Sequence, residues 1–328
     1  MSHTEKSENL NEAISLAANV ILSGGIGGIP TETVYGLAAD ALNPEAVRKI
    51  FAAKGRPFID PLICHVCDMS MARSIAFFTR DAELLAQKFW PGPLTLILKR
   101  KPCVPDIVTA GLETVAVRMP SHKVTAELIR KCGRPLAAPS ANPFGYVSPT
   151  CAEHVREQLG DKIDFVLDGG ECSRGVESTI VSLSEDSRSA GKILRFGPIA
   201  PEELVAALGR ALDCNPKVNE ARPTAPGMLK THYSPRSPLF LFDSPEQVEG
   251  LKSNIIFMRR PENPLSNHYW LSENGDLETA ARSLFSLLRR LDKVSPGGFY
   301  CQRAPERGIG LAINDRLFRA GKPMQGSV

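Results

Sequence analysis

Residues 26–57 read IGGIPTETVYGLAADALNPEAVRKIFAAKGRP, and the fold class follows from how this stretch divides. Its first half is rich in Thr, Val and Tyr and is interrupted by glycines, which favours short extended segments. Asn43 and Pro44 then form a helix start, with Asn as the N-cap and Pro at the first helical position. This helix should run to about Lys54 and stop at Gly55, and PLICHV at 61–66 is typical of a buried strand. The succession of extended, helical and extended segments predicts an α/β fold.

The same mixture of elements continues on both sides of this stretch. Upstream, apolar residues at helical spacing predict a helix that Gly24 and Gly25 end. Downstream, strands are expected at LTLIL, TVAVR, PLAAP, DFVLD, STIVSL and KILRF, and helices at 81–89, 124–131, 152–159 and 201–212. Because these elements do not alternate strictly, we expect a twisted mixed sheet with packed helices. This first domain should span residues 1–212.

Residues 213–236 carry several prolines and show no amphipathic period. A connection longer than about 15 residues is uncommon in a compact domain, which suggests a functional loop as well as a linker. From 237 to 328, strands are expected at PLFLFD, NIIFMRR, YWL and GGFYC, with helices near 246, at 277–291 and at 312–320. Their alternation predicts a smaller, parallel, Rossmann-like α/β domain.

The composition is that of an ordinary globular protein. A length of 328 residues suggests two domains, at roughly 150 residues each. The formal charge of +3 is too small to indicate a nucleic-acid-binding protein by itself. No apolar run approaches the roughly 20 residues that span a bilayer. The polar start, MSHTEKSENLNEA, resembles neither a signal peptide nor a transit peptide, so we expect a cytoplasmic protein without a membrane partner.

The cysteines suggest packing more than chemistry. All eight are scattered, mostly within apolar runs, which is typical of small buried side chains in a reducing compartment. Cys64 and Cys67 form a CxxC pair that could bind zinc, but no second such pair follows. We therefore expect no metal site built from protein ligands.

Two short polar motifs follow regular elements of the first domain. Lys54 and Arg56 lie on a turn fixed by Gly and Pro, where they could hold phosphates or merely cap a helix C-terminus. Ser140 and Asn142 follow an apolar strand, where short polar side chains suit ligand binding but also suit an ordinary turn. From the residues alone, both alternatives remain open for each motif.

A carboxylate site is suggested by the end of another strand. Arg118 closes TVAVR, and a guanidinium there can bind a carboxylate through two parallel hydrogen bonds. Thr33, His65 and Ser178 would complete such a pocket with small polar contacts, although His65 can also be read as a buried strand histidine.

Three segments together carry a family resemblance: PTETVYGL at 30–37, KGRP at 54–57 and PSAN at 139–142. They resemble the YrdC-like family, whose signature is KxR followed by SxN, here Lys54, Arg56, Ser140 and Asn142. WPGPLT, VRMP, STIV and LRFG are similar to the family in order and spacing. The segments HYSP and GIGLAINDRLFRA resemble its long, two-domain form, so the resemblance covers nearly the whole chain.

The resemblance implies roles for individual residues. For L-threonine, the matching positions are Thr33, His65, Arg118, Ala138 through its backbone, and Ser178. For ATP, they are Arg56, Asp60, Thr114, Ser140, Asn142, Ser148, Arg195 and Tyr233, with Tyr233 in a linker that would fold over the site as a lid. Departures occur at Asp60, where the family usually has Asn, at Ser182 and at Phe196. An acid at Asp60 would repel phosphate unless it is protonated, turned away or bound to a metal.

The implied activity is synthesis of L-threonylcarbamoyl-AMP and pyrophosphate from L-threonine, bicarbonate-derived CO₂ and ATP. Mg²⁺ is expected mainly on the ATP phosphates, and Lys54 and Arg56 are the expected catalytic cations. The product would pass to a tRNA threonylcarbamoyl-transferase complex that modifies the adenosine next to the anticodon. A general base is not assigned, and the last domain is open to regulation, lid control or partner docking. Two alternatives are an RNA-binding protein without chemistry and a carbamoyl-adenylate enzyme related to hydrogenase maturation. Weak RNA binding is also compatible with the synthase interpretation.

Overall fold

A computed structural model describes residues 3–183, 191–214, 223–227 and 233–324 of the chain. Residues 215–222 and 228–232 of the expected linker, and 325–328 of the expected last domain, lie outside the described residues. So does His232, the first residue of the HYSP segment.

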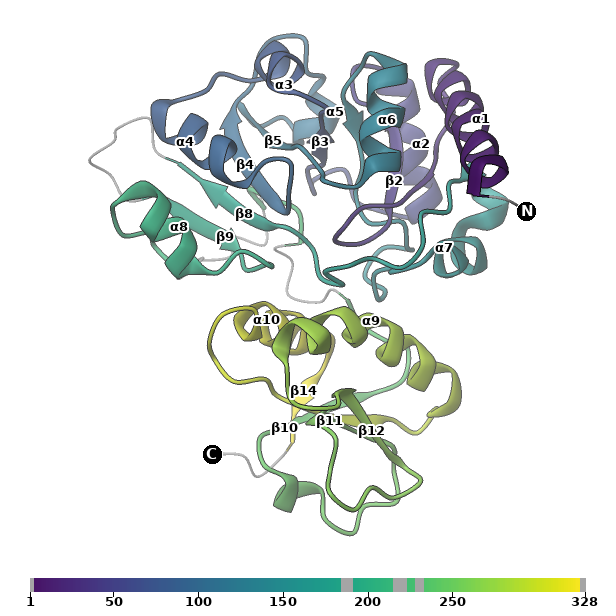
Figure 1. Cartoon of the computed structure of the whole chain (residues 1–328), viewed down its shortest axis with the longest axis vertical. Coiled ribbons are helices and arrows are strands. Elements are labelled where there is room, and N and C mark those ends of the chain that lie inside the picture. Colours follow the sequence, from purple (N-terminus) through teal and green to yellow (C-terminus); the bar gives the residue numbers. More distant parts are fainter. Residues whose placement is uncertain (1–2, 184–190, 215–222, 228–232, 325–328) are drawn as a thin grey trace.

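The strands form two separate sheets, one above the other in Figure 1. The first sheet has the order β7-β1-β2-β6-β3-β5-β4-β8-β9 and mixes parallel with antiparallel pairs. Its strands are β1 (Gly27–Ile29), β2 (Gly36–Asp40), β3 (Ile63–His65), β4 (Leu94–Lys99), β5 (Thr114–Arg118), β6 (Leu136–Ala137), β7 (Phe165–Val166), β8 (Thr179–Ser182) and β9 (Lys192–Arg195). The second sheet has the order β12-β11-β13-β10-β14, and all its pairs are parallel. Its strands are β10 (Leu239–Phe242), β11 (Ile255–Arg259), β12 (His268–Ser272), β13 (Phe299–Gln302) and β14 (Lys322–Pro323).

The expected fold class, a mixed sheet with helices followed by a smaller parallel α/β unit, is confirmed. The helices of the first unit are α1 (His3–Leu22), α2 (Pro44–Lys54), α3 (Met69–Ile75), α4 (Arg80–Phe89), α5 (Asp106–Thr109), α6 (Lys123–Cys132), α7 (Ala152–Leu159), the 3₁₀ helix η1 (Gly160–Lys162) and α8 (Pro201–Leu208). Those of the second are the 3₁₀ helix η2 (Pro245–Val248), α9 (Leu277–Val294) and α10 (Gly310–Ala320). Within the described ranges, no helix is long and apolar enough to cross a membrane.

The predicted start and end of α2 are confirmed. The Asn43 side chain accepts hydrogen bonds from the backbone N–H groups of Glu45 and Ala46. Gly55 ends the helix in the left-handed region, at φ 64°, which glycine adopts without strain. This turn fixes the direction of the chain between Lys54 and Arg56.

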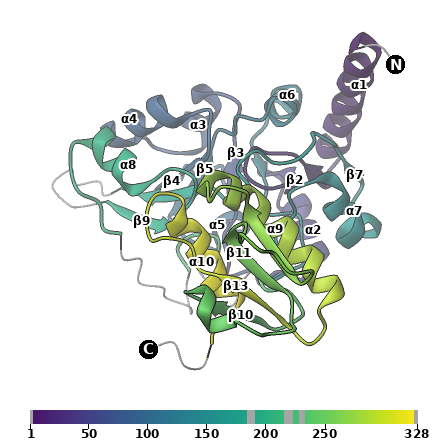
Figure 2. The ribbon, with the colours of Figure 1, turned by 60° about the horizontal axis from the view of Figure 1, so that its bottom comes forward.

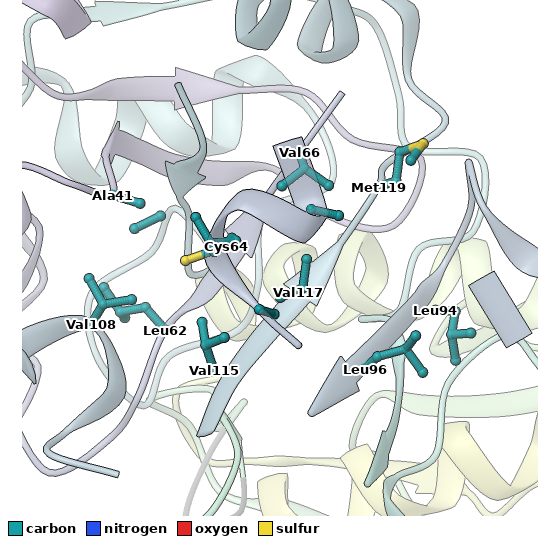
Figure 3. Packing of buried hydrophobic residues seen from close by; sticks show 14 of the residues in the cluster. Ala41, Leu62, Cys64, Val66, Leu94, Leu96, Val108, Val115, Val117 and Met119 are labelled. Carbon is teal, nitrogen blue, oxygen red and sulfur yellow. The ribbon is translucent and has the colours of Figure 1, made fainter. Parts of the chain in front are cut away.

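The first sheet has a packed face and a face that carries the site. Figure 3 shows Cys64, Val66, Val115, Val117, Leu94 and Leu96 of adjacent segments together in one hydrophobic cluster, over which α2, α3, α4 and α8 pack. Because side chains alternate along a strand, His65 and Arg118 lie on the opposite face. On that face α1 and α6 cover the β1, β2 and β6 region, while Ala225 of the expected linker packs on the part formed by β3, β5, β4 and β8.

The second unit presents its helices to the first. Figure 1 shows α9 and α10 between the parallel sheet and the first unit, and Figure 2 shows the same arrangement with the second unit brought forward. Arg289 of α9 and Arg316 of α10 donate hydrogen bonds to residues of the first unit. The second unit therefore borders the site-bearing face.

Candidate active site

A small cavity lies on the site-bearing face, between the first sheet and the described part of the linker. It is lined by predicted residues from eight separate segments: Thr33, Arg56, His65, Arg118, Ala138, Ser140, Ser178, Arg195 and Tyr233. Glu177, Pro226 and Gly227 also line this cavity. The structure thus brings together most of the residues that the sequence nominated.

Arg118 is placed by the end of β5 and is bound on two sides. Its Nη1 donates to Thr33 Oγ1 at 2.9 Å, and its Nη2 lies 2.7 Å from Oε1 of Glu32. Burial would raise the pKa of Glu32, but the adjacent Arg118 guanidinium outweighs it and the net pKa is lowered. A negative group therefore already balances Arg118 before any carboxylate ligand arrives. Sequence reasoning missed Glu32, although it stands inside the PTET motif beside Thr33.

His65 is a neutral side chain in this cavity. It is buried at the end of β3, and its Nδ1 lies 3.3 Å from the carbonyl oxygen of Ile63. Burial, together with the nearby Arg118 charge, lowers the pKa of His65 to about 3. An imidazole in that state offers one donor and one acceptor to a ligand and carries no charge near neutral pH.

Ser178 and Arg195 form one hydrogen-bonded unit. Arg195 donates from Nη2 to Ser178 Oγ and from Nε to the Ser178 carbonyl oxygen, each at 3.0 Å. Ser178 Oγ lies 2.7 Å from Thr95 Oγ1 on β4. A predicted threonine contact and a predicted nucleotide contact are thus joined directly.

Asp60 pairs with Arg56. The Asp60 carboxylate is fully buried outside the cavity lining, and its Oδ2 lies 2.9 Å from Arg56 Nη2. Burial raises the pKa of Asp60, while Arg56, Lys54 and Arg195 oppose that rise. An acid at this position was expected to be protonated, turned away or bound to a metal. In the structure Asp60 is turned away from the cavity and toward the Arg56 guanidinium.

Lys54 ties the two signature motifs together. Its ammonium donates to the carbonyl oxygens of Ser140, at 2.6 Å, and of Asn142. Burial lowers the pKa of Lys54 well below its usual value. Asn142 in turn donates from Nδ2 to the carbonyl oxygens of Pro143 and Tyr146. Neither Lys54 nor Asn142 lines the cavity; both hold the turn that carries Ser140, which does.

Ser148 and Thr114 lie away from the cavity lining. Ser148 is buried behind the cavity-lining Glu177, and its hydroxyl donates to Glu177 Oε1 at 2.5 Å. Thr114 is at the other end of β5 from Arg118 and lines a different cavity, with Lys99 and Ser182. The structure therefore does not bring Thr114 to the other predicted residues in this conformation.

The described parts of the linker line one side of the cavity. Ala225 is fully buried and packs on the apolar strip of Ile63, Ile97 and Ala116 that leads toward Thr114. Gly227 has φ 78°, and a Cβ there would lie 2.6 Å from Tyr233 Oη, so only glycine fits. The space left for water centres is ≈ 40 Å³, which holds about three waters at roughly 10–15 Å³ each. ATP is far larger, so a bound nucleotide would extend beyond this space.

The positions of the acidic, cysteine and histidine side chains bear on whether the protein itself could hold a metal. Among the residues that the structure describes, no group of three or more His, Cys, Asp or Glu could hold a metal ion. Cys64 packs in the cluster of Figure 3, whereas Cys67 packs against the cluster beneath α1 and α6. The CxxC pair is thus split between two hydrophobic clusters.

Comparison with known proteins agrees with the fold and the motifs. The Sua5/YciO/YrdC family model, described as telomere recombination, matches residues 19–197, and the model of the threonylcarbamoyl-AMP synthase C-terminal domain matches residues 199–321. Threonylcarbamoyl-AMP synthase of Bacillus subtilis is 39% identical over 97% of this chain and 95% of its own length. That of Pyrococcus abyssi is 40% identical over 94% of this chain and 93% of its own.

A solved structure agrees over the whole architecture. The crystal structure of P. abyssi Sua5 complexed with L-threonine matches with a TM-score of 0.87 and 37% identity, covering 95% of this chain and 96% of that one. Both units are therefore shared. The chain belongs to the Sua5/YciO/YrdC family, in its two-domain threonylcarbamoyl-AMP synthase form.

Proposed function

We propose that this chain is an enzyme that joins L-threonine, bicarbonate-derived CO₂ and ATP into L-threonylcarbamoyl-AMP, releasing pyrophosphate. The observation that carries the proposal is the cavity where a buried guanidinium, a neutral imidazole and a cationic turn meet. Relatives that share both units at about 39% identity carry the name of this activity. The proposed domain limits are 1–212 for the catalytic unit, 213–236 for the linker and lid, and 237–328 for the last domain.

We propose that threonine binds at the ends of β3 and β5. Arg118 would receive the threonine carboxylate, because its fork is already oriented by Glu32 and Thr33. His65 and Ser178 would bind the hydroxyl and amine side, and the Ala138 backbone would border it. A neutral His65 suits this task, since a cation there would repel the ammonium form of the substrate.

We propose that the nucleotide enters as its Mg²⁺ complex, with the metal on phosphate oxygens. Arg56, Ser140 and Arg195 would neutralise and orient the phosphates, with Tyr233 closing over them. Four residues behind the lining would support it: Lys54, Asn142, Asp60 and Ser148. Thr114 would come within reach of the nucleotide when Ala225 leaves the apolar strip that separates Thr114 from the cavity.

The proposed reaction has two steps. The threonine amine first takes up CO₂ and loses a proton, giving N-carboxy-threonine. One carbamate oxygen then forms a bond to the α-phosphorus of ATP, the bond to the β-phosphate breaks, and pyrophosphate leaves with the electron pair. The protein contributes alignment and charge neutralisation, and the closed linker protects the product from water. A tRNA threonylcarbamoyl-transferase complex in the cytoplasm would then consume the unstable adenylate.

Pyrophosphate release by the purified chain tests the proposal. ATP, Mg²⁺ and bicarbonate are supplied with and without L-threonine, and D-threonine serves as the matched control substrate. The proposal predicts release that depends on L-threonine and falls sharply in Arg118→Lys, because an ammonium cannot replace the fork. Threonine-independent release favours a carbamoyl-adenylate enzyme, and no release with tight, salt-dependent RNA binding favours the RNA-binding alternative.

A further inference from the structure

The last domain reaches the cavity wall through one side chain of α10. Arg316 has 0% of its surface exposed. Its Nε lies 2.9 Å from Oε2 of Glu177, and its Nη1 donates to the Phe196 carbonyl oxygen at 2.7 Å. Its guanidinium carbon lies 5.3 Å from the centre of the Tyr233 ring. Glu177 and Tyr233 both line the cavity, so Arg316 contacts two of its walls from behind.

The same wall is held a second time from α9. The other oxygen of Glu177 accepts the Ser148 hydroxyl at 2.5 Å, and the Ser148 carbonyl oxygen accepts from Arg289 Nε at 3.2 Å. Phe285 stacks on Tyr233 with ring centres 5.7 Å apart. Both helices of the last domain therefore converge on the residues predicted to bind ATP.

Docking the two units does not by itself require a buried arginine. Lys293 and Glu157 make an ion pair of 2.9 Å across the same interface, with 61% and 36% of their side chains exposed. Placing a full charge out of water is unfavourable unless it is paired and hydrogen-bonded, as Arg316 is. The buried charge of Arg316 lies where the interface meets the cavity. There the ion pair fixes the position of the cavity-lining Glu177 carboxylate.

We infer that Arg316 is a positioning residue for the active site, which fixes Glu177 and the Tyr233 ring and thereby shapes the nucleotide side of the cavity. The last domain is then a structural part of the catalytic unit. Tyr233 has a positive φ of 63°, a conformation that a non-glycine residue keeps only when its surroundings hold it. Phe285 and Arg316 supply that hold. This inference rests on the proposed function for the identity of the nucleotide.

The test is steady-state kinetics of Arg316→Met and Arg316→Lys in the full chain, with Lys293→Met as the matched control. Arg316→Met should raise the KM for MgATP at least tenfold, about 1.4 kcal/mol, and the KM for L-threonine less than threefold. Arg316→Lys should restore part of the loss, because it keeps the charge but not the fork. Lys293→Met should leave both constants within twofold. Unchanged constants in a folded Arg316→Met variant, or an equal loss for both substrates, would overturn the inference.

A second variant covers the case in which Arg316→Met does not fold. Glu177→Gln keeps the size of the side chain and removes its charge, and it should show the same selective rise for MgATP. An unchanged MgATP constant in Glu177→Gln contradicts the inference. If the wild-type chain releases no pyrophosphate with threonine, the proposed function fails instead. The positioning role is then decided by calorimetric ATP affinity, which should fall at least tenfold in Arg316→Met.

Discussion

Asp60→Asn should tighten ATP binding and weaken the free protein. In the free chain the Asp60 carboxylate is buried beside Arg56 at 2.9 Å and faces the charges of Lys54 and Arg195. Hydrogen bonds to charged groups contribute about 1.5–3 kcal/mol and neutral ones about 0.5–1.5, so the change should lower the unfolding free energy by about 1–1.5 kcal/mol. When MgATP is bound, its phosphates replace the missing negative charge. The KM for MgATP should therefore fall about tenfold.

Thermal unfolding with and without MgATP, together with steady-state kinetics, measures both halves of this prediction. The midpoint of Asp60→Asn without ligand should be lower than that of the wild type, and the rise on adding MgATP should be larger. Asp243→Asn, which changes an exposed pair with Arg303 in the last domain, is the control and should not alter the MgATP response. A higher KM for MgATP in Asp60→Asn would refute the reasoning, because it would mean that the carboxylate itself contacts the nucleotide or its metal.

Two further substitutions test the roles of buried polar groups. Lys54→Met should cost about 1–3 kcal/mol of stability, since it leaves the carbonyl oxygens of Ser140 and Asn142 without their donor; an unchanged urea midpoint would instead favour a role confined to phosphate. His65→Gln should remove part of the acid sensitivity of folding. The pKa of His65 is about 3 in the folded chain and roughly 6.5 when unfolded, so the unfolded state binds more protons and stability falls as pH drops below 6.5. Between pH 7 and 4.5 the wild type should lose about 2–3 kcal/mol more than His65→Gln in urea titrations, and equal losses would contradict a neutral His65.

Elements with a local signal could be predicted from the sequence. The cap at Asn43 and the end at Gly55 set the limits of α2, and the apolar runs set β3, β4 and β5. The short helices α3 and α5 were not predicted, because a few residues give no helical period to detect. The helix expected near 246 is the 3₁₀ turn η2, and α8 ends at Leu208, short of the expected 212, because Gly209 adopts φ 68°. The strand β14 is two residues long and depends on its partner β10.

The site could be nominated from the sequence but not assembled from it. The motifs named the residues that line the cavity, yet their spacing could not show that Lys54 faces backbone carbonyls or that Asp60 pairs with Arg56. Glu177 and Arg316 were missed, although Glu177 directly precedes the quoted STIV and Arg316 lies within the terminal GIGLAINDRLFRA. Glu177 and Arg316 lie 139 positions apart in the sequence, and only the packing of α10 against the first unit brings them together.

The most direct test of the central claim is to identify the product. The purified chain is incubated with ATP, Mg²⁺, L-threonine and ¹³C-labelled bicarbonate, and the nucleotides formed are analysed by mass spectrometry. We expect L-threonylcarbamoyl-AMP that carries the label in its carbamoyl carbon and appears in step with pyrophosphate. Pyrophosphate released without a labelled threonine adduct of AMP would contradict it.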